Sequence, residues 1–148
     1  PTPMVSVNPI NAQTQLAFAP QIQSVPVGTD LKAQISVSTG VNSLSGVQFT
    51  LNFDPKIVQI MDIVPDNFFA KPTVLLKKID NQKGKIDYAL GSLTPQNGEN
   101  ILATLSLKLI SATSSGATKI SFSQTKAAEG VNNVLKSATD LTIKILQK

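Results

Sequence analysis

Residues 46–55, with the sequence GVQFTLNFDP, constrain the fold of this chain more than any other stretch. Val47, Phe49, Leu51 and Phe53 alternate with polar side chains. Because successive side chains of a strand point to opposite faces, this period of two predicts a strand with one apolar and one polar face. The strand is expected to end at the Asp-Pro dipeptide, since proline has no amide hydrogen to offer a neighbouring strand. Its aromatic face requires a second sheet to cover it.

Segments with strand-like patterns also occur before and after this stretch. They lie at residues 16–18 and 22–25, expected to be one strand broken at Pro20, and at 31–38, 58–64, 74–79, 85–90, 101–110, 119–123 and 141–145. Residues 91–100 and a polar stretch from about 126 to 137 are expected to be loops. About nine short strands without a long helix favour an all-β fold, a two-sheet antiparallel jelly-roll sandwich.

The composition favours one domain that works outside the cytoplasm. Residues 1–14, rich in proline, asparagine, threonine and glutamine, are expected to be a linker or a loosely attached N-terminal arm, and residues 15–148 the folded domain. Charged residues make up only 15% of the chain, which is typical of an extracellular or cell-surface β domain. The chain begins Pro-Thr-Pro and has no apolar run long enough to span a membrane. A monomeric module of a longer exported protein is therefore expected.

Few residues in this sequence could carry out chemistry. Histidine and cysteine are both absent, which removes the usual general base at neutral pH and the soft metal ligands. Asp62 and Asp66 flank a proline-containing stretch and are expected to be solvated loop carboxylates rather than a catalytic pair. The cationic residues are all lysines, mostly scattered singly, without the clustered arginines and aromatic residues that nucleic-acid binding usually requires. Neither an enzyme nor a nucleic-acid partner is expected.

Calcium is the one metal for which oxygen ligands occur in suitable places. Asp30, Asp54, Asp66 and Asp140 lie in expected loops or at strand ends. None of them belongs to the dense run of oxygen ligands found in a dedicated calcium loop. Aspartate at such positions is explained equally well by turn and cap roles. No cofactor is therefore assigned, and loop calcium remains the alternative.

The hairpin of residues 74–90 predicts a surface that suits a protein partner. Residues 80–84 are expected to form a five-residue loop, which places Lys77 opposite Asp87. The side chains expected toward the core are those of Val74, Leu76, Ile86, Tyr88 and Leu90. The side chains expected on the other face are those of Leu75, Lys77, Ile79, Lys85, Asp87 and Ala89. Aliphatic residues on this face would anchor a partner, and its lysines would favour an acidic one.

The order of the segments resembles the cohesin family. The segments that carry the resemblance are VPVGTDLKAQISVS, then GVQFTLNFDPKIVQI, then ILATLSLKLISATSSGATKISFS, and a terminal TIKI strand. They extend over about residues 15–146. Cohesins are nine-stranded jelly-roll modules of bacterial scaffolding proteins, and related modules also occur in envelope and secretion-system proteins.

The resemblance implies a dockerin as partner, a small calcium-loaded domain that cohesins bind through one flat sheet face. The central strand of that face looks like residues 46–53, so Gln48, Thr50 and Asn52 would point at the partner. The hairpin would extend the same surface. One departure concerns the partner's identity, since cellulosomal cohesins typically carry an acidic residue where Gln48 stands. In the strand that resembles their other acidic contact, residues 85–91, only Asp87 is negatively charged.

Two other functions remain open at this level. A carbohydrate-binding module shares the sandwich fold, but commonly stacks a sugar on an exposed tryptophan or tyrosine. This chain has no tryptophan and one tyrosine, Tyr88, which is in phase with the core. A structural spacer in an envelope or secretion-system protein would have uniformly polar outer faces.

The first prediction is that the domain folds without metal, because its branched aliphatic residues suffice to close a sandwich by burial. Thermal melts recorded with a chelator and with millimolar calcium are expected to coincide closely. A difference in melting temperature above about ten degrees would reveal a bound metal that the sequence does not disclose.

Overall fold

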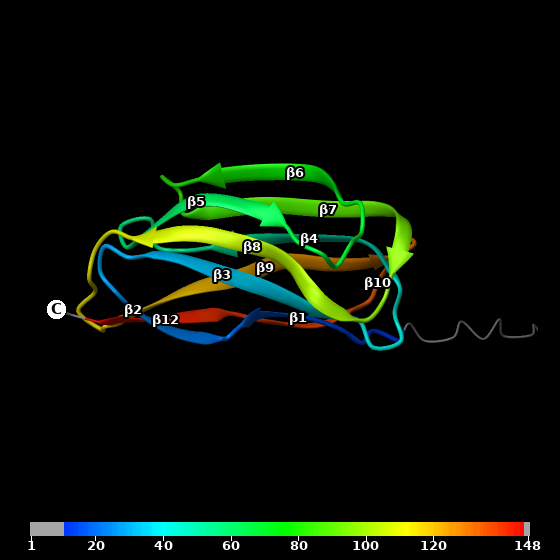
Figure 1. Cartoon of the computed structure of the whole chain (residues 1–148), viewed down its shortest axis with the longest axis horizontal. Helices are drawn as coiled ribbons and strands as arrows, with labels where there is room; N and C mark the ends of the chain where they lie inside the picture. The colour runs from blue at the N-terminus through cyan, green and yellow to red at the C-terminus, as the bar shows by residue number, and fades with distance from the viewer. Residues whose placement is uncertain (1–10, 147–148) are drawn as a thin grey trace, which may run out of the picture.

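The computed structural model describes residues 11–146, which form two β-sheets packed face to face (Figure 1). The strands are β1 (Thr14–Ala19), β2 (Ile22–Pro26), β3 (Asp30–Ser38), β4 (Leu44–Asn52), β5 (Val58–Pro65), β6 (Thr73–Asp80), β7 (Lys85–Gln96), β8 (Glu99–Leu109), β9 (Ala117–Glu129), β10 (Asn132–Asn133), β11 (Leu135–Thr139) and β12 (Leu141–Leu146). The expected all-β sandwich is therefore confirmed. No helix occurs in these residues, and so none that could cross a membrane.

The sheets are mixed rather than purely antiparallel. One has the strand order β11-β1-β3-β8-β5 and the other β2-β12-β9-β4-β7-β6, with β10 paired to β9. The β1–β11 and β2–β12 pairs are parallel, and the other pairs are antiparallel. The stretch around Pro20 does not divide one strand, because β1 and β2 belong to different sheets.

β4 is an interior strand, hydrogen-bonded to β7 on one side and β9 on the other. Its apolar side chains are buried between the sheets as the alternation predicts, with Phe49 at 3% exposure and Leu51 at 0%. The Phe49 ring lies 5.7 Å from the ring of Tyr88 and 5.5 Å from that of Phe122, measured between centroids. Contacts at this separation stabilise aromatic clusters beyond simple area burial.

Two expected loops are instead largely strand. β7 continues to Gln96 and β8 begins at Glu99, which leaves only two residues of the 91–100 stretch between them. The stretch 126–137 holds the end of β9, all of β10 and part of β11. β9 contains a bulge near Gln124, whose φ is +48°, and the pairing with β4 shifts there. A bulge interrupts the alternation of side chains, so the pattern beyond it no longer reads as a strand.

Gln13 and Thr14, which the sequence assigns to the N-terminal arm, are hydrogen-bonded to the sandwich. β1 begins at Thr14, which is fully buried and donates a hydrogen bond from its hydroxyl to Asn42 Oδ1 at 3.1 Å. The backbone N–H of Gln13 donates to the same oxygen at 2.8 Å. Residues 1–10 lie outside the described residues, so the expected arm stays a prediction.

Side-chain contacts link the two sheets along one side of the sandwich, where β5 and β6 are edge strands. Asn81 imitates a neighbouring strand, because its Oδ1 accepts from Ile60 N at 2.8 Å and its Nδ2 donates to Ile60 O at 2.9 Å. Lys77 of β6 forms an ion pair with Asp62 of β5. The hydrogen bond from Lys77 is the main cause that lowers the pKa of Asp62. Asp62 is thus a strand residue with an ion-pair partner rather than a loop residue, and its side chain, 48% exposed, is in contact with solvent as expected.

The second prediction concerns the phase of β4. Phe49→Ala is expected to lower the free energy of unfolding by about 3–5 kcal/mol, because it removes buried surface and leaves a cavity. Gln48→Ala, on the solvent side of the same strand, is expected to cost less than about 0.5 kcal/mol. Urea denaturation of both variants measures the two costs. Equal costs would mean that the two residues do not differ in burial.

The third prediction concerns Tyr88, whose buried hydroxyl has no hydrogen-bond partner among the described residues. Burial, with smaller contributions from Asp62 and Asp66, raises the pKa of Tyr88 to about 12. An unfolded tyrosine ionises near pH 10, so the unfolded state loses its proton first as the pH rises. The contribution of protonated Tyr88 to the free energy of unfolding is therefore fully present below about pH 10. It is lost as the pH rises through about 12.

Denaturation of wild type and Tyr88→Phe between pH 9 and pH 12 tests this prediction. Phenylalanine keeps the ring and removes only an unpaired hydroxyl, so the variant is expected to be at least as stable as wild type at neutral pH. It is also expected to lose less stability than wild type above about pH 10. Parallel losses in the two proteins would contradict the buried, protonated state of Tyr88.

Candidate functional site

The candidate site is the outer face of four neighbouring strands, in the order β9-β4-β7-β6. Cross-strand pairing arranges its side chains in rows. From one end to the other the rows on β9, β4 and β7 are Ser121, Asn52 and Lys85; then Ser123, Thr50 and Asp87; then Lys126, Gln48 and Ala89; and then Ala128, Gly46 and Gly91. β6 continues these rows with Asp80, Lys78, Leu76 and Thr73. The first two rows are polar, the third is mixed, and the last consists of small residues with Thr73 on β6.

Hydrogen bonds fix the side chains of the polar end. The Thr50 hydroxyl donates to Asp87 Oδ1 at 2.7 Å, and Asn52 Nδ2 donates to Ser123 Oγ at 2.8 Å. Asp80 caps the turn that follows β6, where its Oδ1 accepts from two backbone N–H groups. The hydrogen bond from the backbone N–H of Lys83 is the main cause that lowers the pKa of Asp80, and the bond from Gln82 lowers it further. Both carboxylates of this face therefore already accept hydrogen bonds from the chain itself.

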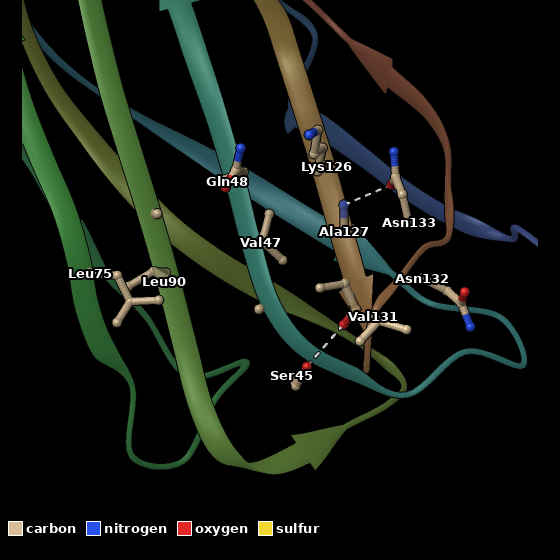
Figure 2. Close-up of a pocket in the computed structure, with 13 residues that line it drawn as sticks. Ser45, Val47, Gln48, Leu75, Leu90, Lys126, Ala127, Val131, Asn132 and Asn133 are labelled. Carbon is tan, nitrogen blue, oxygen red and sulfur yellow. Dashed lines mark hydrogen bonds between the residues drawn. The ribbon is translucent and has the colours of Figure 1, made fainter.

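A hollow of about 330 Å³ lies at the apolar end (Figure 2). Small residues, Gly46, Ala89 and Ala128, are among those that line it, so few side-chain atoms fill the space above the sheet there. Leu75 lines the hollow from β6 and Val131 from the turn between β9 and β10, and Figure 2 shows them on opposite sides of β4. Leu75 is 67% exposed and Val131 101% exposed, so both present aliphatic surface to solvent.

A second hollow of about 270 Å³ adjoins the first, because Gln48 lines both. Its lining includes Thr50, Asp87, Leu76 and Gln124. One face thus offers an apolar hollow and a polar hollow next to each other.

Seven of the nine residues that the sequence assigns to the binding face lie on it. They are Gln48, Thr50, Asn52, Leu75, Lys85, Asp87 and Ala89. Leu75 is the extra residue of a bulge in β6, and its Cδ1 would lie 3.1 Å from a Cβ at Gly91. Its side chain therefore covers the glycine on the outer face.

Lys77 and Ile79 do not lie on this face, which corrects the sequence prediction. The hairpin loop is one residue shorter than expected, since Asp80 pairs with Lys85, and this shift moves the side chains of residues 76–79 to the opposite face. The bulge at Leu75 restores the expected register at Val74, which pairs with Leu90. Ile79 lies opposite Ile86 and packs against the core. Lys77 lies opposite Tyr88 rather than Asp87, and its ion pair is with Asp62.

The same shift explains two residues that sequence reasoning missed on β6. Leu76 was expected in the core, but it lies opposite Ala89, is 49% exposed and lines the polar hollow. Lys78 lies opposite Asp87. On the other side of the face, Lys126 and Val131 fell in an expected loop; only recognition of the bulge at Gln124 would have placed Lys126 on a strand.

Three of the four aspartates considered for calcium accept hydrogen bonds from the chain itself. Asp54 accepts from the backbone N–H of Lys56, Asp66 accepts from the Thr104 hydroxyl, and Asp140 accepts from the backbone N–H of Phe122. Across residues 11–146, no group of three or more acidic side chains is placed to hold a metal ion.

Comparisons with known proteins give a family and a set of similar structures. The family model for the cohesin domain matches residues 17–145. No curated protein matches this chain. A type I cohesin–dockerin complex from Clostridium thermocellum contains a chain with a TM-score of 0.76 and 10% identity, over 91% of this chain and 94% of that one.

Two further structures have the same fold. The third cohesin of ScaC from Acetivibrio cellulolyticus, solved with the ScaB dockerin, has a TM-score of 0.76 and 17% identity over 90% of this chain and 99% of its own. A non-cellulosomal cohesin from the archaeon Archaeoglobus fulgidus has a TM-score of 0.73 and 11% identity over 91% and 92%. The family match extends from β1 to β12. This chain belongs to the cohesin family.

Proposed function

We propose that this chain is a non-catalytic interaction module that binds a dockerin-like domain through the outer face of β9, β4, β7 and β6. The proposal rests on one observation above all. On this face, aliphatic side chains that are open to solvent adjoin polar side chains that are already fixed by hydrogen bonds. Aliphatic anchors beside ordered polar groups are typical of protein-binding surfaces.

The family supports the class of partner. Two of the similar structures are cohesins in complex with dockerins, and this chain has the same fold. Gln48, Thr50 and Asn52 of β4, together with Leu75, Lys85, Asp87 and Ala89, form the proposed contact surface. Leu76 and Lys78 replace Lys77 and Ile79 in that surface, because the observed register of β6 exchanges their faces.

The alternatives have less support. A sugar-stacking site requires an exposed ring, whereas Tyr88 and five of the phenylalanines are buried and the sixth, Phe122, packs against the core. A spacer has no need of a face with Leu75 and Leu76 open to solvent. Because cohesin modules work in scaffolding and envelope proteins, we place the module in an extracytoplasmic protein.

The fourth prediction is that dockerin domains from the source genome include one that binds this chain, and that Leu75→Asp with Leu76→Asp weakens the complex at least about a hundredfold. Two buried carboxylates without partners would oppose association. Isothermal titration calorimetry with each calcium-loaded dockerin measures the affinity.

The matched control is Met61→Asp with Val64→Asp, which places the same charges at exposed aliphatic residues of β5 in the other sheet. This control is expected to bind as wild type does, and thermal melts would verify that both double variants fold. Binding that is insensitive to the β6 pair would place the site elsewhere. A panel in which no dockerin binds wild type would refute the proposed partner class.

A further inference from the structure

The charge at the rim of the apolar hollow is positive. Lys126 is the only charged residue among those that line the hollow, and its side chain is exposed. Lys78 and Lys85 lie elsewhere on the same face and are exposed as well. Within residues 11–146 the one ion pair joins Lys77 to Asp62, so none of these three lysines is neutralised by a salt bridge.

The acidic groups near these lysines are already engaged. Asp87 accepts from Thr50, and Asp80 caps its turn. Glu129 follows Ala128, which lines the hollow, and its carboxylate accepts a hydrogen bond from the backbone N–H of Ser43. These hydrogen bonds do not remove the negative charges, but Lys78, Lys85 and Lys126 outnumber Asp80 and Asp87 on this face, and the charge at the hollow itself is that of Lys126. An acidic partner is therefore the complementary one.

The position of the hollow determines the kind of backbone that can occupy it. The hollow lies over β4 and β7, and each of these strands has hydrogen-bonded neighbours on both sides. Their backbone N–H and C=O groups are used in the sheet, so an incoming segment cannot be added as a further strand there. A segment that lies on this face must satisfy its own backbone groups, as a helix does.

The width of the face also fits one helix. Three strand-to-strand gaps separate β6 from β9, which amounts to roughly 14 Å at the usual spacing of about 4.8 Å. A helix with its side chains is about 10–12 Å across. Leu75 and Val131 border the hollow on opposite sides of β4, as Figure 2 shows, and would contact the two flanks of a helix laid between them.

We propose that the partner binds by an acidic amphipathic helix, which inserts an aliphatic side chain into the hollow beside Leu75 and Val131 and places carboxylates toward Lys126 and Lys85. This inference rests on the proposed function and specifies its partner. An acidic residue at position 48 would favour a basic partner. In this chain the neutral Gln48 stands there, opposite Lys126, so the surface favours an acidic partner instead.

The fifth prediction is tested with three synthetic helical peptides and ¹⁵N-labelled protein. The first peptide has a leucine stripe flanked by glutamates, the second has the same stripe flanked by lysines, and the third keeps the glutamates but has serine in the stripe. The first is expected to shift the amide resonances of Gly46, Ala89 and Ala128 and to bind at least about tenfold more tightly than either of the others. Its affinity is expected to fall as salt is added.

Charge reversal in the protein provides the second part of the test. Lys126→Glu is expected to remove the preference for the glutamate peptide. Lys32 is also exposed and lies on β3 of the other sheet, so Lys32→Glu is expected to leave the preference unchanged. Equal binding of the glutamate and lysine peptides, or amide shifts that map to another surface, would overturn the inference.

The same variants separate this inference from the proposed function. A dockerin whose affinity falls about tenfold with Lys126→Glu and not with Lys32→Glu would support both. A dockerin that requires Leu75 and Leu76 but is indifferent to Lys126→Glu would overturn the acidic helix and leave the proposed function in place. Binding of the glutamate peptide at the hollow without binding of any dockerin would refute the partner class while the acidic helix stands.

Discussion

The pairing of β4 with both β7 and β9 is the interaction on which the rest of the structure depends. It holds Phe49 against Tyr88 and Phe122 inside the sandwich, and the same pairing aligns Gln48, Thr50 and Asn52 in rows with their neighbours outside. Because successive side chains of a strand alternate, the buried face cannot keep its phase unless the outer face keeps its own. Core packing thus determines which polar groups the candidate site presents.

The contacts between β5 and the β6–β7 hairpin give this arrangement a second support. Asn81 occupies the backbone groups of Ile60 on β5, and Lys77 is held by Asp62 of that strand. An edge strand offers unpaired backbone groups, and a side-chain amide that binds them reduces that exposure. Because these contacts hold β6 at the border of the face, Leu75 and Leu76 remain beside β7 and the two hollows.

The sandwich, the phase of β4 and the buried position of Tyr88 could be predicted from the sequence, because the alternation in residues 46–53 and 85–90 is unbroken. The same reasoning failed in β6 and in the second half of β9. The shorter hairpin loop exchanged the faces of Leu76, Lys77 and Ile79, up to the bulge at Leu75. The bulge at Gln124 concealed the second half of β9. Lys77 could not be recognised as an inward residue, because its partner Asp62 belongs to the opposite sheet. Local periodicity carries no information about such contacts.

The central claim is that the outer face of β9, β4, β7 and β6 is the surface that a partner covers. Cross-saturation NMR on the complex of this module with its partner measures that contact directly, because saturation passes only between protons that are close in space. The account predicts the largest signal losses at Gln48, Leu76, Ala89 and Lys126. Losses concentrated on β3 and β8, on the outer face of the other sheet, would contradict it.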